Sequence, residues 1–316
     1  MAIRLGQTQY GKAETRVVRI YRDGERHELR DLNVSTALRG DFAAAHLRGD
    51  QANVLPTDTQ KNTCFAYAKE RGVKAIEDYA LALAGHFVSD IETVSSARVE
   101  VDEYRWERVP VAGTGHAHAF MRAGHEVRTA AVVVEAGEHP VQNSWVISGI
   151  KDLIVLKSTG SEFSGFLKDR YTTLAETTDR ILATSLTARW RYAGEGGAAV
   201  PERRFAADGK TAWDEAFGQV REILLARFAQ VHSLALQQTL YEMGAAVLAA
   251  RDDIAEVRLS APNKHHFLAD LAPFGLANPG EVFYAADRPY GLIQCAVQRD
   301  DAPPAGPAWE SPASFA

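Results

Sequence analysis

The histidines are the residues whose type and spacing could hold a metal ion. His116 and His118 stand two residues apart, so their imidazoles share one face if this segment is a strand, and His125, His265 and His266 supply further nitrogens. A zinc site takes three or four protein ligands, and no third ligand stands at a recognisable spacing from this pair. Two histidines so placed on a strand usually face solvent or a hydrogen-bond partner. The sequence therefore favours a protein without a bound metal.

The motifs of common cofactors and nucleophiles are missing. No G-x-G-x-x-G segment follows a strand and no P-loop occurs, so a dinucleotide or a nucleoside triphosphate has no fingerprint here. No G-x-S-x-G elbow is present, and neither Cys64 nor Cys295 has a local nucleophile signature. Generic motifs therefore identify no reaction.

Composition sets the class of protein. The chain has 316 residues, of which 46% are hydrophobic and 24% charged, and this length favours two globular domains. The net charge of −6 argues against a nucleic-acid partner, since phosphate binding usually needs a basic face. No apolar run approaches the length of a membrane span, and the N-terminus lacks a hydrophobic signal region. The C-terminus is not a Ser-Lys-Leu peroxisomal address, so we expect a cytoplasmic protein with no membrane partner.

Periodicity predicts the same order of elements in both halves. In the first half we expect strands at 15–21 and 27–38, helices around 61–70 and 76–87, then strands at 97–106, 117–122 and 127–135. In the second half we expect strands at 153–157 and 181–192, helices at 213–228 and 234–250, then strands at 254–259, 282–284 and 292–297. We take the strand segments that follow the helices as one antiparallel pair, so each half reads ββααββ.

This pattern favours an α+β fold with antiparallel sheets and helices on one face. We expect similar domains at 1–147 and 148–300, a loop at 193–210, and a proline-rich tail at 301–316 that extends without order. A sheet covered on one face leaves the other to be covered by oligomerisation. The alternative is a monomer of two independent domains.

One long segment carries a resemblance to a known family. Residues 153–180, with Lys157-Ser-Thr-Gly-Ser-Glu-Phe163 near their start, resemble the signature of the urate oxidase (uricase) family at 28 consecutive positions. Three further blocks are similar to the same family: Gln9-Tyr-Gly-Lys12, residues 57–63, and Pro262-Asn-Lys-His265. The resemblance runs from Gly6 to Arg299 and implies tandem tunnelling-fold domains, each ββααββ, that assemble into a β-barrel tunnel.

The resemblance implies a proton relay. Lys12 and Thr57 match the dyad that takes a proton from the substrate, and His265 matches the third member of the relay. A lysine amine is a poor base at neutral pH unless burial or nearby charge lowers its pKa, and a hydroxyl between amine and substrate can pass the proton on. Asp58 lies beside the dyad, where its backbone N–H could donate to the substrate. The adjacent His266 is expected to be an ordinary packed or exposed histidine.

The resemblance also implies a clamp on a planar purine anion. Arg180 supplies a guanidinium fork and Gln237 both a donor and an acceptor, although a shift to Gln238 stays open. The remaining matches are a stacking ring, two pocket walls and an amide that holds dioxygen or water: Phe163, Leu174, Leu236 and Asn263. For the ring and the leucines, plain core packing is the alternative reading.

The reaction implied by the resemblance is oxidation of urate by O2 and water to 5-hydroxyisourate and hydrogen peroxide, without a cofactor. The implied assembly is a homotetramer whose active sites are shared between subunits. One alternative is a tunnelling-fold enzyme that acts on pterins or GTP through histidines and zinc. Another is a purine-binding protein of the same fold that has lost activity, although every matched site residue is kept.

Overall fold

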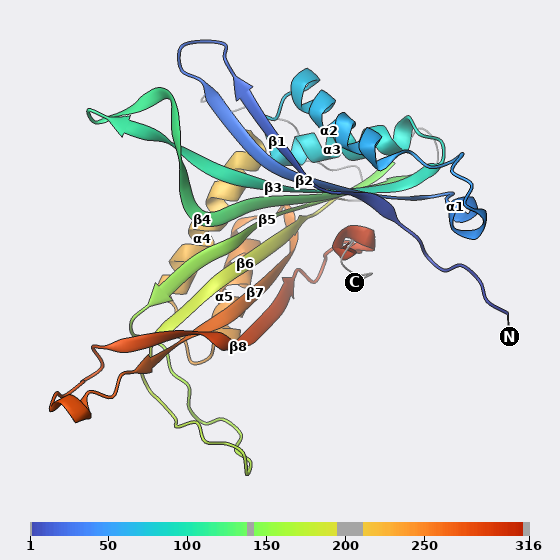
Figure 1. Ribbon diagram of the computed structural model, residues 1–316. Coiled ribbons are helices and arrows are strands. Elements are labelled where there is room, and N and C mark those ends of the chain that lie inside the picture. The colour runs from blue at the N-terminus through green and yellow to red at the C-terminus, as the bar shows by residue number, and fades with distance from the viewer. Residues whose placement is uncertain (1, 138–141, 195–210, 312–316) are drawn as a thin grey trace.

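Eight strands join into one antiparallel sheet in the order β1 to β8, and each strand pairs with its neighbours along the chain (Figure 1). The coordinates are a computed structural model that describes residues 2–137, 142–194 and 211–311. Most of the expected loop at 193–210 and the last five residues lie outside the described part. Antiparallel neighbours need only short connections, which suits this order of strands.

The order of elements confirms the repeat predicted from periodicity. The first half contains β1 (Tyr10–Tyr21), β2 (Glu28–Gly40), α1 (Ala43–Arg48), α2 (Thr57–Glu70), α3 (Ile76–Ser89), β3 (Val94–Val111) and β4 (Thr114–Ala136). The second half contains β5 (Gln142–Lys157), β6 (Leu182–Tyr192), α4 (Ala212–Gln230), α5 (Leu236–Ala250), β7 (Ile254–Leu268) and β8 (Phe283–Gln298), with short 3-10 helices η1 (Ala272–Phe274) and η2 (Gly306–Trp309). Of the α-helices in the described chain, only α1 was not predicted from the sequence.

The first strands of the two halves share one irregularity. β1 gains an extra residue against β2 just after Lys12, and β5 gains one against β6 just after Ile150. Within each bulge a non-glycine residue takes a positive φ, 56° at Glu14 and 58° at Asp152. The same bulge at the same place supports a structural repeat, and bulges of this kind redirect neighbouring side chains.

The helices bury one face of the sheet, and the predicted apolar faces are the ones that pack. The positions predicted on α3, α5 and β6 are all exposed by 5% or less: Ile76, Tyr79, Leu83, Phe87, Leu236, Leu240, Met243, Val247, Leu186, Ala188, Trp190 and Tyr192. Fully burying a large apolar side chain contributes about 1.5–3 kcal/mol. No helix in the described residues is long and apolar enough to span a membrane.

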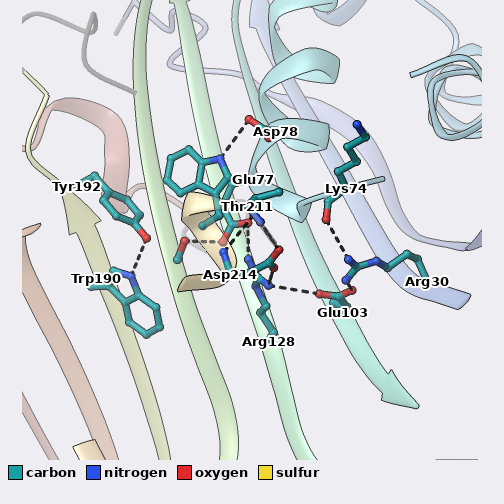
Figure 2. Close-up of polar contacts among 12 residues, drawn as sticks. Arg30, Lys74, Glu77, Asp78, Glu103, Arg128, Trp190, Tyr192, Thr211 and Asp214 are labelled. Atoms are coloured by element: carbon teal, nitrogen blue, oxygen red, sulfur yellow. Dashed lines mark hydrogen bonds and ion pairs between the residues drawn. The ribbon is translucent and has the colours of Figure 1, made fainter. Parts of the chain in front are cut away.

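A buried group of charges joins the two halves (Figure 2). Arg128 on β4 donates to Glu77 on α3 at 2.9 Å and pairs with Asp214 in the first turn of α4, and Ser148 on β5 donates to Glu77 at 2.6 Å. Burial lowers the pKa of Arg128, but the surrounding carboxylates outweigh it and raise the pKa, so the guanidinium stays charged. The ion pairs therefore connect elements of both halves beneath the sheet.

Two predicted pairs of short strands are wrong. Residues 117–122 and 127–135 belong to one strand, β4, and the hairpin turn lies instead at Ala112 and Gly113, between β3 and β4. Residues 282–284 and 292–297 likewise lie on the single strand β8 apart from position 282. In both cases the pairing shifts its register without ending, so glycines and prolines that suggest turns lie within long strands.

The expectation of an unordered tail is also wrong for the described part. After β8 the chain returns onto the sheet and forms η2, where Ala308 is fully buried against Ala131 and Ile147. These contacts join residues far apart in the sequence, which local composition does not reveal.

The predicted boundary between residues 147 and 148 falls inside β5. This strand pairs with β4 on one side and β6 on the other, so the sheet continues across the boundary. The division into domains 1–147 and 148–300 stays a prediction about the repeat.

Two helical glycines offer a matched test of packing. A Cβ on Gly244 of α5 would lie 2.7 Å from Val297 Cγ2, so Gly244→Ala forces a stiff, buried valine to move. Such overpacking costs about 1–3 kcal/mol. Gly218 of α4 is exposed and nothing lies within 4 Å of its Cβ position, so Gly218→Ala stabilises by about 0.5–1 kcal/mol through helix propensity. Urea unfolding of both variants measures the difference, and a stabilising Gly244→Ala would contradict the close packing of α5.

Candidate active site

The backbone at Lys12 is held by a short chain of polar contacts. The Lys12 N–H donates to Thr36 Oγ1 at 3.3 Å, and that hydroxyl donates to Gln60 Oε1 of α2 at 2.7 Å. A Cβ on Gly11 would lie 1.7 Å from the Thr36 carbonyl oxygen, so β1 reaches this closeness to β2 only with glycine. These contacts fix Lys12 against β2 and α2 immediately before the bulge.

Thr57 and Asp58 open helix α2, which has no side-chain cap. The Asp58 carboxylate turns toward its own helix, where it pairs with Lys61 and accepts from Asn62 Nδ2 at 3.0 Å. The hydrogen bond and charge of Lys61 lower the pKa of Asp58, with smaller contributions from the hydrogen bond of Asn62 and the charge of Lys12. Backbone N–H groups of a first helical turn lack intrahelical acceptors and can bind an anion.

Phe163 and Arg180 lie against each other. The Arg180 guanidinium carbon is 5.0 Å from the centroid of the Phe163 ring. Phe163 and Thr177 exchange backbone hydrogen bonds of 2.8 and 3.0 Å, and the Arg180 N–H donates to the Ser161 carbonyl at 2.9 Å. Burial lowers the pKa of Arg180, and its Nε is buried with no hydrogen-bond partner among the described residues. These backbone hydrogen bonds close the base of the loop between Phe163 and Thr177. The half-buried Arg180 guanidinium lies beside the Phe163 ring.

The start of α5 is bound to the same loop. The Ser233 N–H donates to the Gly160 carbonyl at 2.9 Å, and the Ser233 carbonyl accepts from the Glu162 N–H at 2.7 Å. Ser233 is fully buried and its hydroxyl accepts from Thr239 Oγ1 at 2.7 Å. The first turn of α5 is therefore fixed next to Phe163.

The two glutamines of this turn differ in their surroundings. Gln238 Oε1 accepts from the Leu234 N–H at 3.0 Å, so its side chain holds the start of the helix. Gln237 is exposed, and no hydrogen bond within the described chain engages its side chain. Leu236 before it is 3% exposed and packs in the core. Of the two, Gln237 is the side chain available to a ligand.

Asn263 and His265 lie on β7. Asn263 pairs with Thr184 on β6 and Gly291 on β8, and the His265 ring stacks on Phe267 at 5.8 Å between centroids. Thr184 Oγ1 is buried and has no partner within the described chain. Asn263 therefore lies beside the strand that follows Arg180.

Leu174, predicted as a pocket wall, lies on an exposed loop. It is 57% exposed, in the same loop as Leu167 and Tyr171, which are 95% and 71% exposed. Several large apolar side chains exposed on one loop are typical of a surface that contacts another molecule.

The predicted site residues form two groups that the sheet keeps apart. Lys12 and Thr57 lie at the edge formed by β1, whereas Asn263 lies on β7. From β1 to β7 there are six strand spacings of about 4.8 Å, or roughly 30 Å along the sheet. No hydrogen bond or ion pair between described residues joins the groups. The predicted site residues of one chain therefore fall into two groups, which we call the β1 half-site (Lys12, Thr57, Asp58) and the β7 half-site (Phe163, Arg180, Leu236, Gln237, Asn263, His265).

The histidine pair does not acquire further ligands. His116 and His118 lie 4.6 Å apart by ring centroids, and His116 Nδ1 accepts from the backbone of residues 118 and 119. Among the described residues, no group of three or more His, Cys, Asp or Glu side chains could hold a metal ion.

Thr36 and Gln60 are supporting residues that the sequence analysis did not identify. Both are buried, and together they connect Lys12 to α2. A buried glutamine in the first turn of a helix is a weak signal, and its partner lies 24 residues away.

Comparisons with known protein families, sequences and structures all match this chain to one family. The family model described as Uricase matches residues 8–133 and 146–294. The uricase of Arthrobacter globiformis is 49% identical over 311 residues, covering 98% of this chain and 95% of that protein. The uricase of Cyberlindnera jadinii is 36% identical over 305 residues, covering 95% and 99%. The crystal structure of uricase from A. globiformis superposes with a TM-score of 0.88 at 48% identity, covering 98% of this chain and 100% of that one.

The contact between Thr36 and Gln60 gives a test of how the β1 half-site is supported. Thr36→Val leaves the fully buried Gln60 carboxamide without its partner, which costs about 1–3 kcal/mol of folding free energy. Replacing both polar groups, in Thr36→Val with Gln60→Leu, should recover part of that loss, because the Gln60 carboxamide is no longer buried without a partner, whereas the Lys12 N–H lacks its acceptor in both variants. Chemical denaturation of the three variants measures this. Equal destabilisation by the single and the double change would contradict the role of the contact.

Proposed function

The chain belongs to the uricase family, and we propose that it oxidises urate with dioxygen at a site that two subunits build together. Urate, O2 and water give 5-hydroxyisourate and hydrogen peroxide: two electrons pass from the purine to O2, and water supplies the new hydroxyl oxygen. The observation that carries the proposal is the division of the matched residues into two half-sites at distant parts of one sheet. Each half-site suits a different part of this chemistry.

The β7 half-site suits a flat anion. The Arg180 guanidinium can donate two parallel hydrogen bonds to adjacent acceptors on the purine edge, and its charge favours the urate dianion. Gln237 supplies one donor and one acceptor to the opposite edge, and its exposed amide supports its choice over Gln238. Phe163, already beside Arg180, stacks on one ring face and leaves the other face open. Leu174, on its exposed loop, forms the apolar wall, and Leu236, buried in the core at the start of α5, supports it from behind.

The β1 half-site suits proton transfer. Lys12 accepts a proton from urate through the Thr57 hydroxyl, and the resulting dianion is electron-rich enough to reduce O2. His265 completes the relay and returns the proton to the peroxide that leaves as hydrogen peroxide. Asn263 and Thr57 hold dioxygen, and then the attacking water, over the free ring face. The Asp58 N–H, in the uncapped first turn of α2, donates to the substrate anion.

A second subunit brings the half-sites together. Lys12 lies on the edge strand β1, so a neighbouring chain can approach it, and Leu174 lies on an exposed loop. Stabilising charges then surround the substrate in a site closed to water, where they act more strongly than in solution. We propose a homotetramer in which each active site combines one β1 half-site with the β7 half-site of a neighbour.

The rival function within this fold is a zinc enzyme acting on pterins or GTP. It requires a ligand set for zinc, and the described residues offer none. Metal analysis of the purified protein, together with an activity assay in chelator, separates the two functions.

The first test is aerobic loss of the urate ultraviolet band with peroxide assayed in parallel. We expect equal amounts of urate lost and peroxide formed, with no effect of chelator. Lys12→Met should lower kcat by about 100-fold or more, the range for loss of a general base, with a much smaller change in urate affinity. No urate loss, or loss abolished by chelator, would refute the proposed activity, and an unchanged rate in Lys12→Met would remove its role.

The shared site is tested by mixing two inactive variants. Lys12→Met and Arg180→Gln damage different half-sites, so co-refolded mixtures contain some sites with both halves intact. Random assembly should restore about a quarter of the wild-type activity. A mixture of Lys12→Met with Thr57→Ala is the control, since both changes damage the same half-site and no activity should return. If the mixture of Lys12→Met and Arg180→Gln forms tetramers, as shown by light scattering, but recovers no activity, both half-sites must lie in one chain.

A further inference from the structure

The C-terminal segment crosses the face of the sheet that the long helices leave open. Ala130 and Val132 of β4 pack in the core beneath the helices, whereas Ala131 between them packs with Ile147 and Ala308. Because side chains alternate across a strand, Ala308 of η2 lies on the opposite face. Figure 1 shows η2 in front of the strands and α4 and α5 behind them.

Charged side chains that are themselves buried hold this segment, which we call the C-terminal strap (Pro303–Glu310). The three hydrogen bonds to these side chains join the Pro303 carbonyl with Arg191 at 2.9 Å, the Ala308 carbonyl with Arg98 at 2.8 Å, and the Trp309 indole with Glu256 at 2.8 Å. The side chains of Arg191, Arg98 and Glu256 are exposed by 3%, 9% and 4%. The strap is therefore anchored on β6, β3 and β7.

Its last contact leads through β2 to the residue that precedes the strand carrying Lys12. Glu310 pairs with Arg39 on β2, and Arg39 Nε and Nη2 both lie 3.3 Å from Gln9 Oε1. Gln9 immediately precedes β1 and stands three residues before Lys12. A continuous line of contacts thus runs from the strap through Arg39 to the start of β1.

We propose that Glu310 and Arg39 are positioning residues that hold the start of β1 so that the Lys12 amine meets its substrate. This inference rests on the proton-accepting role proposed for Lys12. β1 is an edge strand with a bulge just after Lys12, so within the chain it pairs with another strand, β2, on one side only. Small displacements of a reacting group lower the rate far more than they lower binding, because substrate contacts lie elsewhere.

The kinetic test compares Glu310→Ala with Asp301→Ala. Asp301 belongs to the same C-terminal stretch, is 76% exposed and pairs with Arg299 at 3.0 Å, away from β1. We expect Glu310→Ala to lower kcat about three-fold, in keeping with the small energy of an exposed ion pair, with the KM for urate unchanged. Asp301→Ala should match wild type, and Glu310→Asp should restore most of kcat. If Glu310→Ala matches Asp301→Ala, or if its kcat and KM change together, the proposal is overturned.

A double variant shows whether the two residues act through one contact. Arg39→Met removes the contacts to both Glu310 and Gln9, so its kcat should be lower than that of Glu310→Ala. Adding Glu310→Ala to Arg39→Met should cause no further loss, whereas independent effects would multiply.

Hydrogen exchange tests the positioning without reference to urate. We expect faster exchange of the amides of residues 10–16 in Glu310→Ala and wild-type exchange in Asp301→Ala, with the rest of the sheet unchanged. Unchanged exchange at β1 would overturn the proposal. If the wild-type enzyme does not oxidise urate, the proposed function fails, and the exchange measurement still decides whether the strap holds β1.

Discussion

Strands β1 and β8 both lie at edges of the sheet and do not pair with each other, and the form of the candidate site follows from this constraint. Lys12 lies on one edge strand and Asn263 on the strand next to the other edge. Roughly 30 Å of sheet separates these two strands, which is far more than the width of a urate molecule. The open sheet thus makes association with a second chain a requirement of the proposed chemistry.

If two chains build each site, every subunit has to hold its two half-sites in a fixed relation, and the chain must be rigid between them. The buried ion pairs of Arg128 with Glu77 and Asp214 meet this requirement by joining α3, β4 and α4 across the two halves (Figure 2). Replacing a buried ion pair with apolar residues is often neutral for stability, but its geometry is specific. The Arg128 cluster is therefore better explained as fixing the halves relative to each other than as a source of stability.

The elements that depend on residues close together in the sequence could be predicted from the sequence. The inward faces of α3 and α5 follow from spacings of three and four, and the repeated order of elements follows from alternation and turns. The long strands β4 and β8 were divided wrongly, since a bulge and a turn look alike in sequence. The docked tail was missed because Arg98 and Ala308 are 210 residues apart, and no local signal joins them.

The residues of the candidate site also divide into those that the sequence marks and those that only the fold brings together. Residues 153–180 form one contiguous block, so resemblance alone marks Phe163 and Arg180, and the structure then shows the ring and the guanidinium in contact. The residues that support Lys12 carry no such mark in the sequence. Thr36, Gln60 and Arg39 connect to Lys12 only through the pairing of β1 with β2 and the packing of α2.

Buried polar atoms without partners in the described chain include Gln60 Nε2, beneath Lys12, and Arg180 Nε and Thr184 Oγ1, beside the clamp. Folded proteins rarely leave such atoms unpaired, because each costs about 1–3 kcal/mol. Comparable unpaired atoms also lie away from both half-sites, at Arg128 Nε and Arg227 Nε, so unpaired atoms alone do not mark the site; the assignment rests on the matched residues and on their division between β1 and β7.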